Sequence, residues 1–364
     1  MRKTRGFIFF QIIIVLFFLL FPALYNATAF NFNLPFKNDL KPGDEGAHFI
    51  RYIPVIEWWY FNVVFNKENS DLRDWSAMIS FNHGSNTLEK PDILFITLYD
   101  DENKTYGGMI NKDRNTLQAI RYGMNITFEN SWVKGIYPQW YLHVEDEDAD
   151  LDHEIIMDLY FKAKSLPYWV GMNTGHGSPR SLIGYYSINH CEVSGYITID
   201  GKVYRVFGTG YHDHTWAPYF KIASGFWDWF SIHFDNGLHA FIWILNPIGK
   251  NSLISITPRF CWITDGQNFT DIKFFKMEYL EFENTSIPGF IRPKKYHISS
   301  SSSFPKIDLY LETKNIHEYL WQRVSTSSIT GMWEGTCSVN GTMIINSNVS
   351  DITGSAIAEI IRII

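Results

Sequence analysis

Beyond residue 30 the chain contains no long stretch with helical periodicity, and this feature restricts its fold more than any other. Short segments rich in β-branched and aromatic residues alternate there with Gly, Asn, Asp and Pro, which is typical of strands separated by turns. In GYITIDGKVYRVFG at 195–208, Asp200-Gly201 separates two such segments and predicts a tight antiparallel hairpin. Asp235-Asn236-Gly237 predicts another hairpin. Strands at this spacing indicate a β-sandwich or β-barrel.

The predicted strands form two groups of similar content on either side of KIASG at 221–225. Because 364 residues exceed the usual size of a single core, we expect two all-β domains, at 45–222 and 223–364. The strands expected are 58–65, 75–81, 92–99, 154–163 and the two halves of 195–208 in the first domain, and 226–234, 238–245, 252–263, 273–282, 307–314 and 332–341 in the second.

The first 29 residues have the pattern of an export signal, in which basic residues precede a continuous apolar run. The length of the run fits either a cleaved signal peptide or a retained membrane anchor. Small residues at Ala27 and Ala29 favour cleavage after Ala29. We therefore expect an exported protein that is secreted or extracytoplasmic, with membrane association through residues 7–24 if the segment is retained.

Aromatic residues make up 17% of the chain and charged residues only 19%, with a net charge of -7. This balance offers no electrostatic footprint for nucleic acid. Large aromatic surfaces instead favour a hydrophobic small molecule as the partner. The three cysteines lie far apart, so neither a disulfide framework nor a thiolate zinc site is expected.

The segment GTGYHDHTWAPYF at 208–220 carries the strongest candidate for chemistry. On a strand, Tyr211 and Asp213 project to one face, whereas His212 and His214 project to the other. Burial among aromatic rings would raise the pKa of Asp213 and let it deliver a proton to an alkene, with Tyr211 hydrogen-bonded to it. The alternative is a structural aspartate paired with an arginine. Pro218 is expected to end or kink the strand.

The two histidines of this segment could also be metal ligands, since they share a strand face. A catalytic zinc site needs three protein ligands, and no third ligand is evident in the sequence. We therefore expect no metal and no cofactor.

A second cluster, EWWY at 57–60, opens the first predicted strand. Alternation places Glu57 and Trp59 on one face and Trp58 and Tyr60 on the other. A carboxylate beside two tryptophans needs a partner if it is buried, so Glu57 is a second acid/base candidate. WDW at 227–229 has the same pattern, with its two tryptophans on one face.

Four segments, EWWYFNVVF, GYYSINHCEVSGYITIDGKVYRVFGTGYHDHTW, WDWFSIHFDNG and MWEG, occur in the order typical of the carotenoid 1,2-hydratase family, which includes hydroxyneurosporene synthase and the AttH-like proteins. The chain resembles this family over nearly all of residues 45–364. The resemblance implies two consecutive lipocalin-like β-barrels with a ligand cavity where they meet. It also implies acid/base addition of water to a terminal isoprenoid double bond, with Tyr211 and Asp213 at the matching positions.

These observations favour an exported enzyme, either a hydro-lyase of the hydratase type or an isomerase or cyclase, acting on an isoprenoid or polyene. The alternatives are a non-enzymatic lipid carrier, a pericyclase like some relatives in the family, and a surface β-sandwich that recognises glycans or proteins. The catalytic candidates are Asp213, Tyr211 and Glu57, and the candidates for ligand contact are Trp58, Trp59, Tyr60, Tyr186, His212, His214, Trp216, Trp227 and Trp229.

Overall fold

The computed structural model describes residues 38–49, 55–66, 68–84, 90–146, 152–170, 173–218, 226–245, 259–300, 305–322, 329–345 and 348–363. In this part of the chain nearly all regular structure is β, as the sequence predicts, and the single helix, α2, spans only Pro42–Glu45. No helix there has the length and apolar content required to cross a membrane. The predicted export segment at 1–29 and the predicted domain boundary at 222/223 lie outside the described residues.

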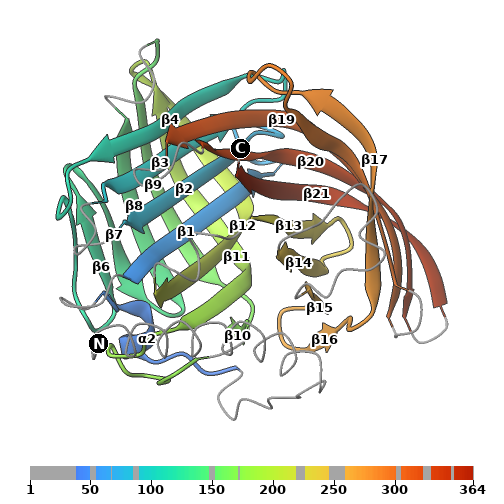
Figure 1. Ribbon diagram of the computed structural model, residues 1–364, viewed down its shortest axis with the longest axis horizontal. Coiled ribbons are helices and arrows are strands. Elements are labelled where there is room, and N and C mark those ends of the chain that lie inside the picture. Colours follow the sequence, from blue (N-terminus) through green and yellow to red (C-terminus); the bar gives the residue numbers. More distant parts are fainter. Residues whose placement is uncertain are drawn as a thin grey trace, which may run out of the picture.

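The strands form two antiparallel sheets that curl into half-barrels side by side (Figure 1). The first sheet has the order β4-β3-β2-β1-β12-β11-β9-β8-β7-β6-β5, and β10 pairs with β11. Its strands are β1 (Val55–Phe65), β2 (Ser76–His83), β3 (Asp92–Tyr99), β4 (Thr105–Lys112), β5 (Leu117–Ala119), β6 (Met124–Phe128), β7 (Ser131–Ile136), β8 (Gln139–Asp146), β9 (Ile155–Ala163), β10 (Tyr168–Trp169), β11 (Gly184–Ile199) and β12 (Lys202–Pro218).

The second sheet has the order β16-β15-β14-β13-β21-β20-β19-β18-β17. Its strands are β13 (Trp227–Phe234), β14 (His239–Leu245), β15 (Arg259–Thr264), β16 (Phe269–Asp271), β17 (Phe275–Asn284), β18 (Ile291–Ser300), β19 (Lys306–Gln322), β20 (Ile329–Ile345) and β21 (Asn348–Ile363). In both sheets the last long strand closes back onto the first, because β12 pairs with β1 and β21 pairs with β13.

Both predicted hairpins are present. Asp200 and Gly201 have φ values of 51° and 76° between the paired residues Ile199 and Lys202. Two consecutive positive φ angles match the twist of a two-residue hairpin, which explains why Asp-Gly stands there. Gly237 has a φ of 82° in the turn between β13 and β14. β12 is described as far as Pro218, which still pairs with Val55 of β1, and the predicted effect of Pro218 on the strand beyond it lies outside the described residues.

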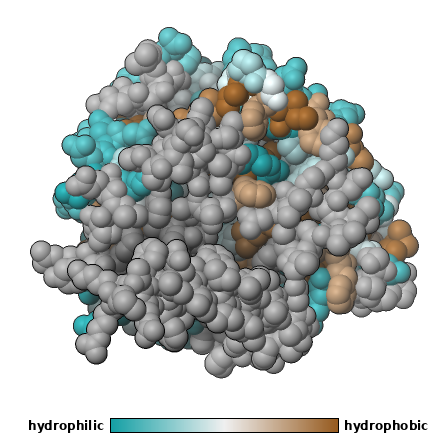
Figure 2. All heavy atoms as spheres, viewed as in Figure 1, coloured by the Kyte–Doolittle hydropathy of each residue, from teal (hydrophilic) through white to brown (hydrophobic). Residues whose placement is uncertain are grey.

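Three apolar clusters hold the sheets together. One cluster fills the inside of the first sheet and another the inside of the second. The third lies between the sheets and contains side chains from the opposite, outer faces of both. β1 and β12 therefore bury side chains on both faces. On the molecular face seen in Figure 2, hydrophobic residues gather in small groups among hydrophilic ones.

Candidate active site

A pocket lies between the two sheets, within the third apolar cluster. The space between its side chains is about 320 Å³, including the part open to solvent. Six of its eight lining residues are aromatic and the other two are carboxylic acids. The first sheet contributes Trp58, Tyr60, Tyr185 and Asp213, and the second contributes Trp227, Trp229, Trp243 and Glu359. Apolar walls with a few polar groups are typical of small-molecule sites.

Strand alternation explains why these side chains meet. Tyr60 is the direct cross-strand partner of Asp213 on β12, so the two stand side by side on the outer face of the first sheet. Trp58 lies two residues before Tyr60 and faces the same way. On the second sheet, Trp229 pairs with Glu359 on one side and with Trp243 on the other. Each wall of the pocket is therefore a row of residues across neighbouring strands.

Asp213 is held by two tyrosines and is only 3% exposed. Its Oδ2 accepts hydrogen bonds from Tyr211 at 2.9 Å and Tyr185 at 3.1 Å. Its buried Oδ1 has no hydrogen-bond partner among the described residues. Burial raises the pKa of Asp213 well above its ordinary value, although the two tyrosine hydroxyls lower it, and the nearby charge of Glu359 raises it further. Burial therefore favours the neutral form of Asp213, and Oδ1 is the oxygen left to carry a proton.

The second sheet places two further carboxyl groups at this interface. Trp227 donates its indole N–H to Glu359 at 2.5 Å, and Tyr60 donates its hydroxyl to Glu334. Glu334 and Glu359 are direct partners across β20 and β21, so like charges would lie side by side. Burial and the charge of Glu359 raise the pKa of Glu334, which favours its neutral form. The indole of Trp229 ties the sheets together through a 3.2 Å hydrogen bond to Tyr185.

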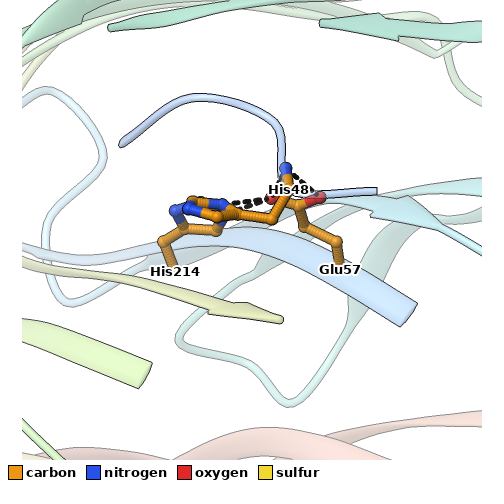
Figure 3. Close-up of side chains that lie close together, drawn as sticks. All are labelled: His48, Glu57 and His214. Atoms are coloured by element: carbon orange, nitrogen blue, oxygen red, sulfur yellow. Dashed lines mark hydrogen bonds and ion pairs between the residues drawn. The ribbon is translucent and has the colours of Figure 1, made fainter. Parts of the chain in front are cut away.

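Glu57 lies on the opposite face of β1, inside the first sheet, where it binds the segment that precedes β1 (Figure 3). Its oxygens accept the backbone N–H groups of His48, at 2.9 and 2.8 Å, and of Phe49, at 3.0 Å. Its Oε1 also contacts the rings of His48 at 3.1 Å and His214 at 2.8 Å. The hydrogen bonds from both histidines outweigh burial and lower the pKa of Glu57 to about 2.

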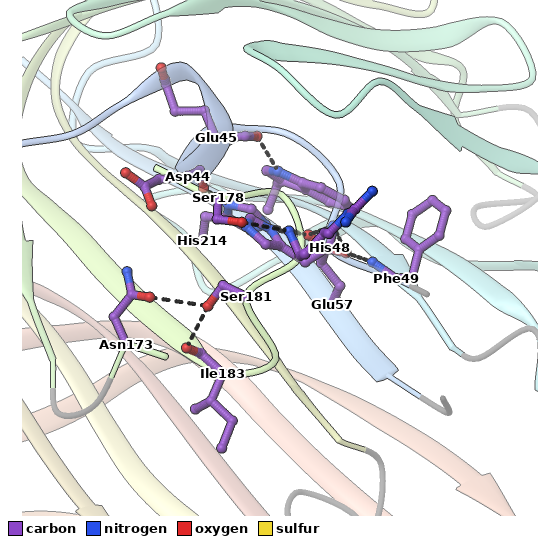
Figure 4. Close-up of polar contacts among 12 residues, drawn as sticks. Asp44, Glu45, His48, Phe49, Glu57, Asn173, Ser178, Ser181, Ile183 and His214 are labelled. Atoms are coloured by element: carbon purple, nitrogen blue, oxygen red, sulfur yellow. Dashed lines mark hydrogen bonds and ion pairs between the residues drawn. The ribbon is translucent and has the colours of Figure 1, made fainter. Parts of the chain in front are cut away.

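His214 lies between Asp44 and Glu57. Its Nδ1 contacts the backbone carbonyl of Asp44 at 2.9 Å and therefore carries a hydrogen, which turns Nε2 toward the Glu57 carboxylate. Burial lowers the pKa of His214 to about 4, although the hydrogen bond with Glu57 and the charge of that carboxylate raise it. Figure 4 shows the same segment held over β1. The backbone carbonyl of Glu45 accepts the indole N–H of Trp59 at 3.0 Å. We interpret the cluster of His48, Glu57 and His214 as a structural clamp that holds the segment before β1 against that strand.

His48, Glu57 and His214 are also the three groups that could hold a metal ion, because their ligand atoms lie within 4.8 Å of one another. The sequence indicates no third metal ligand beside His212 and His214. His48 belongs to no motif, so the sequence does not mark it as a ligand. The Glu57 oxygens are already engaged by three backbone contacts. These hydrogen bonds engage Glu57 and both ring nitrogens of His214, whereas the buried Nε2 of His48 has no hydrogen-bond partner among the described residues.

The structure separates the predicted site residues into two groups. Asp213, Trp58, Tyr60, Trp227 and Trp229 line the pocket, and Tyr211 contacts Asp213 from within the same cluster. The others are buried on the inner side of the first sheet and are absent from the pocket lining, namely Glu57, Trp59, Tyr186, His212, His214 and Trp216. His212, for example, contacts the backbone carbonyl of Tyr60 at 2.9 Å and the hydroxyl of Tyr186 at 3.3 Å.

Four residues at the interface were not predicted individually. Tyr185 stands beside the predicted Tyr186, but on the opposite face of β11. Trp243 and Glu334 lie within predicted strands, and only the cross-strand register reveals their position. Glu359 comes from an apolar C-terminal stretch with no turn signal and no motif.

The comparisons with known proteins agree with this architecture. The crystal structure of a protein assigned as AttH from Nitrosomonas europaea has a TM-score of 0.62 at 15% identity, covering 92% of this chain and 97% of that one. Kievitone hydratase from Nectria haematococca has a TM-score of 0.57 at 14% identity, covering 89% and 98%. CghA in complex with Sch210972 has a TM-score of 0.51 at 12% identity, covering 90% and 96%. At these identities the likeness establishes a shared fold.

Among curated proteins none matches the chain. The resemblance to carotenoid 1,2-hydratases in particular stays a prediction, because none of the three structures named above is such an enzyme. The family model for AttH-like proteins matches residues 171–360, which is more than half of the chain and includes Asp213 and Glu359. The chain therefore belongs to the AttH-like family.

Proposed function

We propose that this protein is an enzyme that adds water to a C=C bond of an apolar isoprenoid or polyene, with Asp213 as the proton donor. The observation that carries the proposal is a buried carboxyl group with a raised pKa and an unengaged Oδ1 in an aromatic pocket. A protonated carboxyl group at a site that excludes water is suited to general acid catalysis. The kievitone hydratase fold lends support as an analogy only.

In the proposed reaction the O–H bond at Oδ1 of Asp213 breaks and a C–H bond forms at the less substituted alkene carbon. The positive charge then lies on the neighbouring carbon, facing the tryptophan rings of the pocket. Tyr211 and Tyr185 hold the carboxylate that forms, because both donate to Oδ2. Water adds to the charged carbon and releases a proton, which restores the acid. General acid catalysis of this kind typically contributes about 10²–10⁴-fold in rate.

The dimensions of the pocket favour reaction at the end of a chain. The space of about 320 Å³ includes open solvent, so only the end of a chain would enter between the sheets and the rest of a long polyene would extend outward. A terminal double bond is therefore the best fit. Hydrophobic small molecules are the class of partner that we propose.

Asp213→Asn tests the proposal, because an amide keeps the shape of the side chain and cannot donate a carboxylic proton. Purified protein is incubated with squalene-like and carotenoid polyenes, and the products are identified by mass spectrometry. Asp158→Asn on β9 is the matched control, since its side chain is 59% exposed and far from the pocket lining. We expect Asp213→Asn to lose turnover and retain ligand, and Asp158→Asn to match the wild type.

The same experiment separates the other functions. A lipid carrier would retain polyene without converting it in either protein. A cyclase would give a product isomeric with its substrate, and because ring closure can proceed without proton transfer it would persist in Asp213→Asn. Turnover to a hydrated product that is unchanged in Asp213→Asn would exclude Asp213 as the acid.

We also propose that the protein is exported, on the basis of the basic residues and apolar run at its N-terminus. Mass spectrometry of the mature N-terminus tests this. A mature chain that starts near Phe30 supports a cleaved signal, whereas recovery of an intact N-terminus in the membrane fraction supports an anchor through residues 7–24.

A further inference from the structure

Three carboxyl groups converge on the interface between the sheets without a cationic partner. Asp213 comes from β12, Glu334 from β20 and Glu359 from β21. Their hydrogen-bond donors are tyrosine hydroxyls and one tryptophan indole. In the described part of the chain, no lysine, arginine or histidine forms an ion pair with any of them. A buried negative charge that lacks a protein partner is costly unless a ligand supplies the opposite charge.

The aromatic walls of the pocket also suit a positive charge. Trp58 from the first sheet and Trp227 from the second lie nearly parallel, with ring centroids 6.5 Å apart and an angle of 18° between the planes. Trp229 and Trp243 complete the wall on the second sheet. The face of an indole carries negative electrostatic potential, and cations bind over it within about 6 Å of the ring centroid.

Glu359 is the acid best placed to meet a ligand's charge. It lines the pocket and is partly exposed to it, whereas Glu334 behind it is fully buried. One of its oxygens accepts the Trp227 indole N–H, which fixes the side chain beside the aromatic wall. Asp213, across the pocket, has an unengaged Oδ1. One carboxyl group on each sheet therefore faces the same space.

We propose that this pocket is a cation site in which the Glu359 carboxylate and the surrounding tryptophan faces bind an organic cation with apolar substituents. The inference rests on the proposed function for the location of the site and extends it by naming the charge that the site recognises. During hydration the cation is the carbon next to the one that Asp213 protonates. A tertiary or quaternary ammonium group of the same shape mimics that carbon and binds without reacting.

The pH dependence of binding follows from the groups that face Glu359. Burial raises the pKa of Glu359 to about 7, while the hydrogen bond from Trp227 lowers it. The facing groups are Asp213 on β12, Glu334 on β20, and the tyrosines at 60 and 319 on β1 and β19, and burial raises the pKa of all four. Glu359 is thus the group that ionises near neutrality. Cation binding should strengthen as the pH rises through about 7.

The probes are trimethylhexylammonium, whose charge does not depend on pH, and a neutral analogue in which carbon replaces nitrogen. Binding is measured by tryptophan fluorescence, because four tryptophans line the pocket. Wild-type protein is compared with Glu359→Gln and with Asp351→Asn, a carboxyl-to-amide change at an exposed position of the same strand, β21. Trp58→Leu removes one ring face from the opposite sheet and leaves Glu359 intact. It therefore tests the cation site through the aromatic wall if Glu359→Gln fails to fold.

At pH values above the pKa of Glu359, we expect wild-type protein and Asp351→Asn to bind the cation at least about tenfold more tightly than the neutral analogue. This preference should fall below about threefold in Glu359→Gln, in Trp58→Leu and at acidic pH. Equal binding of the two probes to wild-type protein, or a full preference in Glu359→Gln, would overturn the inference. Neither result depends on turnover. If Asp213→Asn loses hydration but wild-type protein binds both probes equally, only the cation site is refuted. If wild-type protein prefers the cation but shows no hydration, only the hydratase is refuted.

Discussion

The clamp around Glu57 gives the sharpest prediction about stability. Glu57→Gln keeps the size of the side chain but replaces one acceptor oxygen by an NH₂ group. Because Glu57 accepts backbone N–H groups on both oxygens and contacts two histidine rings, the amide must turn its NH₂ toward at least one donor. The side chain is 0% exposed, so water cannot take the place of the lost contacts.

The size of the effect can be worked from the same contacts. Two charge-assisted hydrogen bonds at about 1.5–3 kcal/mol each give a loss of about 3–6 kcal/mol, which overlaps the usual cost of about 3–5 kcal/mol for removing one partner of a buried ion pair. The fall in the pKa of Glu57 from 4.5 to about 2 corresponds independently to about 3 kcal/mol. Both figures are large against a typical domain stability of about 5–15 kcal/mol.

The lowered pKa of Glu57 also fixes the direction in which its stabilising effect changes with pH. The folded-state pKa of Glu57 lies below its unfolded value, so the stabilisation is complete above 4.5 and disappears as the pH falls toward about 2. Glutamine does not titrate. The difference in unfolding free energy between wild type and Glu57→Gln should therefore be greatest near neutral pH and shrink in acid.

Urea unfolding followed by circular dichroism, at neutral pH and at several acidic pH values, measures this difference. Glu192→Gln is the control, because its carboxylate is 61% exposed and pairs with Lys164 at the surface, where the loss should stay below about 1 kcal/mol. If Glu57→Gln lost no more stability than Glu192→Gln, or if its deficit were the same in acid, the clamp would not hold the fold in the way described.

Three further outcomes follow from the structure. Tyr211→Phe removes one of the two donors to Oδ2 of Asp213, so turnover should fall about tenfold while ligand binding persists, as steady-state kinetics would reveal. The three cysteines are buried free thiols with raised pKa values, so alkylation followed by mass spectrometry should modify them only after unfolding. Burial lowers the pKa of His233 from 6.5 to about 3 and that of His239 to about 2. Both residues therefore destabilise the folded state increasingly as the pH drops below 6.5. His239→Phe should weaken the fall of the unfolding free energy in acid, as measured by urea unfolding.

Strand alternation made much of the site predictable. It correctly placed Tyr211 with Asp213, and Trp58 with Tyr60, because side chains two residues apart on a strand share a face. Alternation does not say which face meets the ligand. Since β1 and β12 bury both faces, the inner residues such as Trp59 have the same apolar signature as those of the pocket.

The rest of the site depends on contacts between distant segments. His48 reaches Glu57 because the segment before β1 folds back over that strand, and no periodicity marks such a contact. Glu359 meets the pocket because β21 closes the second sheet between β13 and β20. Pairing order of this kind is a property of the closed sheet, whereas the local pattern reports only that a strand exists.

The location of Asp213 between the sheets, instead of inside one, accounts for its acidity. The first sheet alone provides Tyr211 and Tyr185, whose hydroxyls lower the pKa of Asp213. The second sheet provides Trp229, Trp243 and Glu359, which exclude water and add negative charge, and both effects raise it. If the sheets were separated, Asp213 would face solvent with its two tyrosines and ionise as an ordinary aspartate. The proton that the proposed chemistry requires is thus retained only when both halves of the chain are packed together.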